Sequence, residues 1–131
     1  MYDLNQRTFL FAKEIVLYCN EFPNNLSGRN IANQLFRSGT SVGANYRAAK
    51  RARSDREFIS KMNIVLEEAD ECLFWLQLIN STELIKLPKT TCLINEAEEL
   101  VKISVSILKK MNNRNKGEGS ISTSSMTKGR N

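Results

Sequence analysis

Apolar side chains recur at helical spacing in four segments of the chain. In the first, from Leu4 to Phe22, large apolar residues stand 4, 3 and 4 positions apart, which places them on one face of a helix. The run Pro23-Asn24-Asn25 is predicted to end this helix. The four apolar residues are Phe11, Ile15, Tyr18 and Phe22.

The second segment is predicted to begin near Ser27, a residue type that caps helix N-termini. It contains Gly39 and Gly43, each of which costs about 1 kcal/mol relative to Ala inside a helix. Either another helix or a subunit packs closely over the glycines, or the helix kinks near Gly39. The predicted inward line alternates steps of 4 and 3 through Ile31, Leu35, Ser38, Val42, Asn45, Ala49 and Ala52.

The third segment has the clearest start, because Ser54-Asp55-Arg56-Glu57 forms a capping box in which Glu57 is expected to reach back to the N–H of Ser54. A short connection follows Asn80-Ser81-Thr82, and a fourth helix is predicted after Pro88, ending near Asn112. The stripe of the third helix is Phe58, Met62, Val65, Ala69, Cys72, Leu76 and Ile79; that of the fourth is Leu93, Ala97, Leu100, Ser104, Ile107 and Met111.

Residues 113–131 are polar, aperiodic and rich in Ser, Gly and Asn, which predicts a disordered tail. The four amphipathic segments, with no strand-like alternation between them, predict an all-α fold. We therefore expect an antiparallel up-and-down four-helix bundle over residues 1–112.

The composition excludes several classes of chemistry. With 0 His in 131 residues, His-dependent nucleophilic catalysis, His-ligated zinc and di-iron Glu-x-x-His sites are ruled out. The 3 cysteines are far apart and have aliphatic neighbours, so we interpret them as buried, reduced thiols. The carboxylate clusters around Glu67 and Glu96 lack a completing ligand, and we expect no metal, no cofactor and no enzymatic activity.

No apolar run reaches the roughly 18–20 residues of a membrane span and no secretory signal is evident, which favours a cytoplasmic protein.

The net charge of +5 is unevenly distributed. Residues 29–61 carry +6, whereas residues 67–99 carry −6. On a helical wheel, five cations of the second segment fall on one outward stripe about 33 Å long, a length that suits a nucleic-acid backbone. Two other interpretations stay open, namely an ordinary solvated face and a subunit contact with the acidic face at Glu67, Glu68, Asp70 and Glu71. The stripe consists of Arg29, Arg37, Arg47, Lys50 and Arg51.

Several motifs resemble a known family. They are Gln34-Leu35-Phe36-Arg37-Ser38-Gly39-Thr40-Ser41-Val42-Gly43-Ala44-Asn45-Tyr46-Arg47, then Phe58-Ile59, Asn63-Ile64, Glu68-Ala69-Asp70-Glu71 and Trp75-Leu76. Together they are similar to the bacterial four-helix-bundle proteins encoded in intervening sequences of 23S ribosomal RNA genes. That group includes the accessory variability determinant of diversity-generating retroelements. The resemblance covers all four helices and leaves the tail unmatched, and Gly39 departs from the alanine expected at its position.

The resemblance implies a homopentamer with a basic surface, which in the retroelement protein binds nucleic acid and a reverse transcriptase. We expect Gly39 and Gly43 near the subunit contact, and Asn45 as a buried polar residue that fixes helix register. Two functions follow. The first is a non-catalytic accessory protein that binds RNA or DNA through its backbone. The second is a scaffold whose charges serve self-association or a protein partner.

Overall fold

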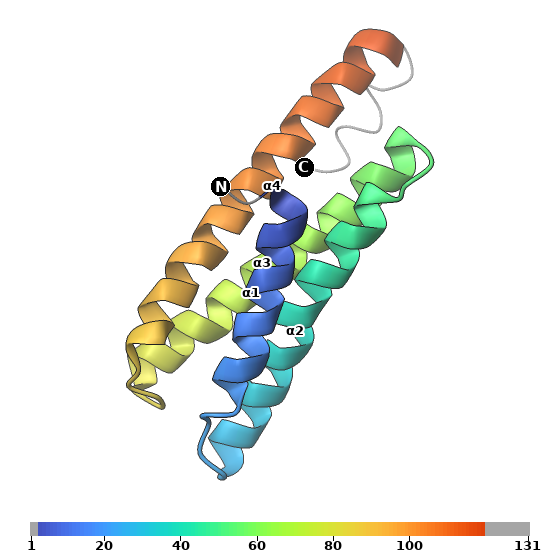
Figure 1. Cartoon of the computed structure of the whole chain (residues 1–131). Coiled ribbons are helices and arrows are strands. Elements are labelled where there is room, and N and C mark those ends of the chain that lie inside the picture. The colour runs from blue at the N-terminus through green and yellow to red at the C-terminus, as the bar shows by residue number, and fades with distance from the viewer. Residues whose placement is uncertain (1–2, 120–131) are drawn as a thin grey trace.

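The computed structural model of the chain describes residues 3–119. The described residues form four helices, and consecutive helices run in opposite directions and pack side by side (Figure 1). The described residues contain no strand, so the predicted all-α, four-helix fold is confirmed. The elements are α1 (Leu4–Cys19), α2 (Leu26–Lys50), α3 (Asp55–Thr82) and α4 (Pro88–Gly119).

The helix starts differ from the sequence expectation in their detail. The hydroxyl of Ser54 accepts from the backbone N–H of Glu57 at 3.0 Å, as predicted. The Glu57 carboxylate, however, accepts from the backbone N–H of Arg53 rather than that of Ser54. The cap of α2 is Asn25 and not Ser27, because the Asn25 side chain already accepts the orphan N–H three residues later, at 2.8 Å.

Two helix ends were predicted wrongly. Helix α1 ends at Cys19, three residues before Phe22, because the Asn20 N–H turns back to carbonyls of the last turn. Helix α4 continues to Gly119 instead of ending near Asn112, so the predicted tail is helical over its first residues. Residues 120–131 of that tail lie outside the described part of the chain.

An ion pair accompanies the longer α4. Arg114 donates to both carboxylate oxygens of Asp55, at 3.1 and 2.9 Å, and thereby joins α4 to the first residue of α3. A periodicity argument based on apolar residues cannot detect this contact, because it depends on two exposed charged side chains 59 positions apart.

The core follows the predicted stripes, with one exchange in α2. Tyr46 is buried, with 8% of its surface exposed, and it occupies the inward position assigned to Asn45. The core residues of α2 are therefore Leu35, Ser38, Gly39, Val42, Tyr46 and Ala49. Ile31 and Ala52, also predicted to face inward, are only half-buried.

The glycines of α2 lie against α1 of the same chain. A methyl group at position 39 would lie 2.6 Å from Cγ2 of Ile15, and one at position 43 would lie 3.3 Å from the Thr8 carbonyl oxygen. Helix α2 is unbroken through both glycines, so close helix packing, and not a kink, offsets their cost. The buried Gly39 is therefore not free to contact another subunit, which corrects that expectation.

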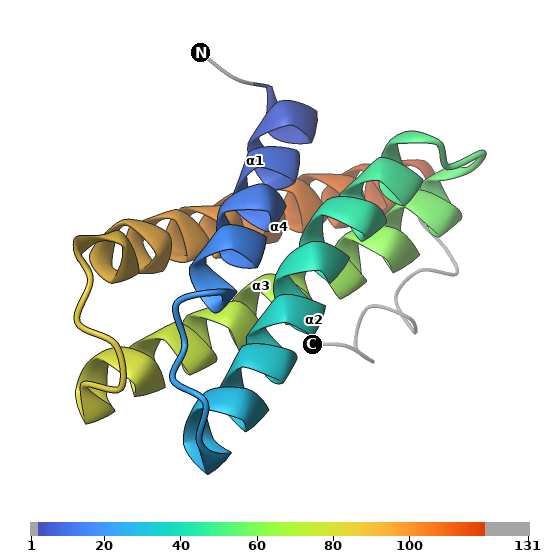
Figure 2. The same cartoon turned by 60° about the horizontal axis from the view of Figure 1, so that its bottom comes forward.

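Helix α1 is the shortest of the four, with 16 residues against 32 in α4. Figures 1 and 2 show that it covers only part of the bundle and diverges from α4. Three polar links nevertheless join the two helices: Arg7 to Glu96 at 2.6 Å, Lys89 to Glu14 at 2.7 Å and the Tyr18 hydroxyl to that of Thr90 at 2.6 Å. Beyond the start of α1, the end of the bundle consists of α2, α3 and α4.

Candidate nucleic-acid interface

The structure divides the predicted basic stripe of α2 into three parts. Arg47, Lys50 and Arg51 lie together where the helix ends. Arg29 lies near the opposite end, about 27 Å from Arg47 at ~1.5 Å per residue, and donates to the side chain of Asn24. All five residues of the stripe are exposed, but Arg37 has a different role from the others.

Arg37 is held by the acidic face of α3 in the same chain. Its guanidinium donates to Glu68 at 3.1 Å and to Glu71 at 2.7 Å. These two bonds raise the pKa of Arg37, and the ion pairs bridge α2 and α3. Here the basic and acidic helices meet within one protomer, so Arg37 is a bundle contact and is removed from the candidate interface.

The same bridge also lowers the pKa of Glu71. Burial by itself raises the pKa of this carboxyl group, but hydrogen bonds from Trp75 and Arg37 outweigh it and hold the pKa below its ordinary value. The Trp75 indole N–H donates at 3.0 Å, which leaves the carboxylate bound on both oxygens. Glu68 and Glu71 therefore serve the bundle and are not aimed at a common ligand.

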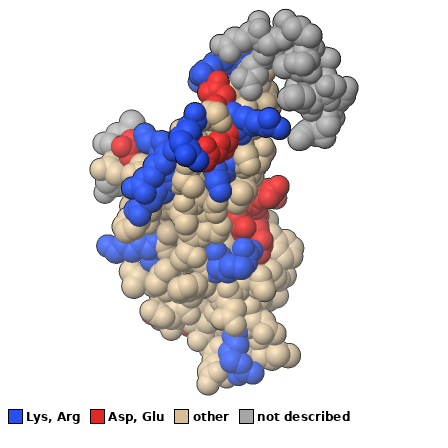
Figure 3. Space-filling model, turned by 90° about the vertical axis from the view of Figure 1, so that its right-hand side faces the viewer, with Lys and Arg blue, Asp and Glu red and all other residues tan. Residues whose placement is uncertain are grey.

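Further cations extend the remaining patch onto the next helix. Arg53 precedes α3 and Arg56 lies in its first turn, both of them exposed. We call Arg47, Lys50, Arg51, Arg53 and Arg56 the basic end of the bundle. Between positions 47 and 57 these 5 cations are accompanied by 2 carboxylates, Asp55 and Glu57. Figure 3 shows Lys and Arg gathered at the upper end of one face and sparse below it.

The single-helix wheel missed the contribution of α3, although the density of Arg and Lys between positions 47 and 57 was a usable signal. Asp55 is neutralised by Arg114, and Glu57 lies 4.0 Å from Arg53. Within the described residues, no carboxylate lies at ion-pair distance from Arg47, Lys50 or Arg51. These three cations are therefore available to a phosphate.

A cleft of about 510 Å³ opens at the basic end, between α2, α3 and α4. Lys50 and Arg53 line its rim, and Phe58 and Met111 contribute apolar surface. The cleft exists because α1 starts too far down the bundle to cover this end. The surface of the basic end is therefore concave between the three helices.

Asn45 does not fix the register between helices as predicted. Its side-chain amide donates to the carbonyl and to the hydroxyl of Ser41, at 3.0 and 2.8 Å, one turn earlier in the same helix. The side chain is half-buried, and both of these bonds stay within α2. The bonds satisfy a polar group beside the core and do not link two helices.

The three cysteines differ in their environments. Cys72 is buried and donates to the hydroxyl of Ser38, and burial raises its pKa to about 12. Burial likewise raises the pKa of Cys19 to about 12. Cys92 is exposed, which contradicts the prediction that all three thiols are buried. In the part of the chain that the structure describes, no three His, Cys, Asp or Glu side chains gather as a metal site requires.

None of the helices in residues 3–119 is both long enough and apolar enough to span a membrane.

Comparison with known proteins gives a family match and a structural match. A family model described as 23S rRNA-intervening sequence protein matches residues 2–106. A crystal structure of a protein of unknown function from the S23 ribosomal protein family of Bacteroides thetaiotaomicron is 36% identical, with a TM-score of 0.73. The similarity covers 82% of this chain and 99% of that one. No curated protein sequence is significantly similar to the chain.

Proposed function

This chain belongs to the 23S rRNA-intervening sequence protein family, and we propose that it is a non-catalytic accessory protein that binds the phosphate backbone of RNA or DNA. The observation that carries the proposal is the basic end, where Arg47, Lys50 and Arg51 are exposed and have no carboxylate partner within the described residues. Phosphate neutralisation by such cations releases counterions and favours binding without regard to base sequence.

The placement of aromatic residues supports a backbone-directed mode. Phe36 of α2 is exposed but lies ~16 Å along the helix from Arg47, away from the basic end. Tyr46 is the aromatic residue of α2 next to the basic end, and it is buried in the core. It therefore offers no face on which an unpaired base could stack. Arg and Lys at the end of a helix bind phosphates without reading base edges, so we expect weak sequence preference and strong salt dependence.

We further propose that the protein acts in the cytoplasm as a homo-oligomer, with the pentamer implied by the family resemblance as the expected state. An assembly would repeat the basic end once per subunit. Several weak sites on one nucleic acid then act together and raise the overall affinity well above that of a single site. The alternative function, a scaffold without nucleic-acid binding, is favoured by an exposed apolar groove between α1 and α2.

The test compares two charge-matched variants. Lys50→Gln/Arg51→Gln removes two cations from the basic end, and Lys86→Gln/Lys102→Gln removes two exposed cations elsewhere. Binding to a fluorescent 20-nucleotide RNA and to a DNA duplex is measured by anisotropy from 50 to 300 mM salt. If both cations bind phosphate, the log–log salt slope of the first variant is shallower by about 1.4–1.8, whereas that of the control is unchanged.

Far-UV circular dichroism confirms that each variant retains its helices. Absence of binding by the wild type at about 50 mM salt would contradict the proposal, because electrostatic binding is strongest at low salt. Equal loss in both variants would show attraction to the net charge of the protein and not to the basic end. The first result leaves the scaffold function as the better explanation, and the second removes the basic end as the binding site.

A further inference from the structure

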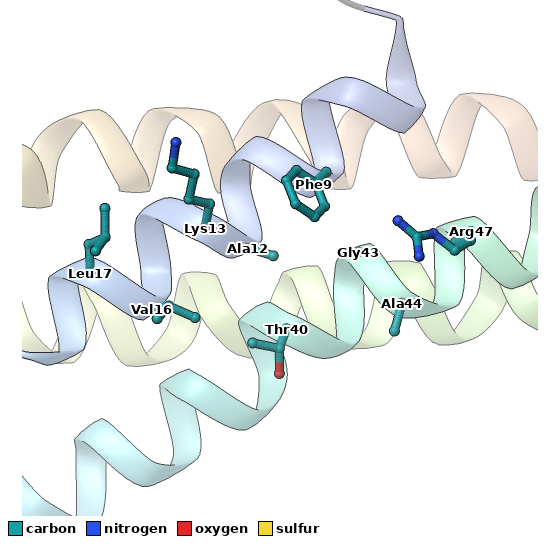
Figure 4. Close-up of a pocket in the computed structure, with 9 residues that line it drawn as sticks. All are labelled: Phe9, Ala12, Lys13, Val16, Leu17, Thr40, Gly43, Ala44 and Arg47. Carbon is teal, nitrogen blue, oxygen red and sulfur yellow. The ribbon is translucent and has the colours of Figure 1, made fainter.

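An apolar groove of about 410 Å³ runs between α1 and α2 on the outer surface. Phe9 and Leu17 of α1 line it and are 59% and 52% exposed, so the monomer leaves two large apolar side chains in water. Gly43 and Ala44 of α2 form its other side and add little bulk. Figure 4 shows the apolar residues of α1 along one side of the groove and the small residues of α2 along the other.

Two cations border this groove. Lys13 lies between Phe9 and Leu17 on α1, and Arg47 extends from α2 in the direction of Phe9 (Figure 4). Both cations are exposed, and the described residues hold no carboxylate at ion-pair distance from either. The groove is therefore apolar along its length and positively charged at its edges, which favours an occupant with a large apolar side chain and carboxylates.

The outer face of α3 has the complementary composition. Phe74 is 55% exposed, and its ring contacts only Trp75 edge-on among the aromatic rings of the described residues. Asp70 and Glu67 lie one and two turns before it on the same face, and both are exposed. We call Glu67, Asp70 and Phe74 the α3 ridge. At 100° per residue the ridge is opposite the core positions Met62, Val65, Ala69 and Leu76.

The dimensions of the two surfaces agree. From Glu67 to Phe74 is about 10.5 Å along the helix axis, and from Phe9 to Leu17 is about 12 Å, at ~1.5 Å per residue. The acidic and apolar positions of the ridge thus span the length over which the groove offers apolar contacts and cations. The ridge by itself is long enough to cover the apolar residues of the groove and to reach its bordering cations.

We propose that the groove receives the α3 ridge of a second copy of this chain. Phe74 enters the apolar groove beside Phe9 and Leu17, and Glu67 and Asp70 approach the bordering cations. Groove and ridge lie on different helices and share no residue, so one subunit uses both at once. Such a contact is head-to-tail, and its repetition yields a closed ring or an open filament, not a two-fold dimer.

This inference rests on the homo-oligomer that is part of the proposed function and specifies its contact. Arg47 belongs both to the basic end and to the groove, but Lys50 and Arg51 belong to neither the groove nor the ridge, so variants at these two positions test nucleic-acid binding separately from the contact. Loss of the contact would leave a monomer that still binds nucleic acid. Loss of nucleic-acid binding would leave the oligomer intact.

The experiment inactivates each surface separately. Ala44→Trp fills the groove, and Phe74→Glu removes the apolar residue of the ridge; both positions are exposed, so the fold is expected to persist. Phe9→Asp is a second groove variant in case Ala44→Trp does not fold. The matched controls are Ser106→Trp and Val105→Glu on α4, which introduce the same residues at exposed positions outside both surfaces.

Sedimentation velocity of the nuclease-treated proteins is the readout. We expect the wild type and both controls to be oligomeric, and each surface variant to dissociate, with self-association weaker by at least about tenfold. A one-to-one mixture of a groove variant and Phe74→Glu retains one intact groove and one intact ridge per pair. It is therefore expected to form a dimer and to stop there.

In a head-to-tail contact the wild type grows beyond two subunits whereas the mixture stops at a dimer, and a two-fold contact does not give this difference. A monomeric wild type at about 100 μM, or oligomers that survive in both surface variants, would overturn the proposal. A mixture that stays monomeric would overturn it as well, because the variants would then not complement each other.

Discussion

The close approach of α1 and α2 at Gly39 makes a quantitative prediction for two alanine substitutions one helical turn apart. Gly39→Ala and Gly43→Ala introduce the same methyl group into the same helix, and each gains about 1 kcal/mol of helix propensity. The two sites differ in the space available. A methyl group at position 39 meets three Ile15 side-chain atoms at 2.6–2.9 Å, whereas at position 43 the nearest atoms are 3.3 and 3.4 Å away.

The contact at position 39 is far inside the 3.5–4.0 Å at which carbon atoms pack favourably. Ile15 is fully buried and its β-branched side chain is stiff at χ1, so moving it away from the added methyl group costs free energy. Overpacking of this kind costs about 1–3 kcal/mol, with the upper part of that range fitting so short a distance. After the gain in helix propensity, we expect Gly39→Ala to be destabilised by about 1–2 kcal/mol.

At position 43 the added methyl group is tight but tolerable. We therefore expect Gly43→Ala to lie between unchanged and about 1 kcal/mol more stable than the wild type. Urea unfolding followed by circular dichroism at 222 nm measures both values, and two protein concentrations separate folding from association. Equal stabilities of the two variants, or a stable Gly39→Ala, would refute the packing argument.

Three further predictions follow from the contacts described. Arg37→Gln should cost about 1 kcal/mol at pH 7, discounted for the exposure of Arg37, by urea unfolding. Because the folded pKa of Glu71 is below its ordinary value of about 4.3, this difference should vanish as pH falls through the folded pKa; a difference that persists at pH 2 would contradict the bridge. With a thiol reagent at pH 8, Cys92 should react first and Cys92→Ser should remove the rapid phase, since burial raises the pKa of the other two thiols to about 12. Tyr18→Phe should cost about 1–2 kcal/mol in thermal unfolding, because it leaves the buried Thr90 hydroxyl without its partner, and an unchanged midpoint would argue against that bond.

The number and order of the helices were determined by the sequence alone. The period of apolar residues requires one buried face per helix, and turn residues such as Pro23 and Pro88 mark the interruptions. The Ser54 cap was equally local, since it depends on residues within four positions of each other. The density of Arg and Lys between positions 47 and 57 is likewise a property of the sequence itself, and it marks the basic end.

Other features depended on neighbours that are distant in sequence. Arg37 belonged to the basic stripe by its position on α2, and only the packing of α3 brought Glu68 and Glu71 to it. The role of Gly39 required the position of Ile15 on α1, 24 residues earlier. The glycines themselves indicate a close approach or a kink, but the local pattern does not identify Ile15, and it gives no sign of the Arg37 contact.

The choice between Asn45 and Tyr46 as the inward residue illustrates the physical reason. One step along a helix rotates a side chain by 100°, so the centre of the buried face is uncertain until the neighbouring helices are in place. Here α1 packs on the glycine side of α2 and turns that side inward, which buries Tyr46 and leaves Asn45 at the margin. Periodicity determined that α2 has a buried face, and the packing of α1 decided which residues occupy it.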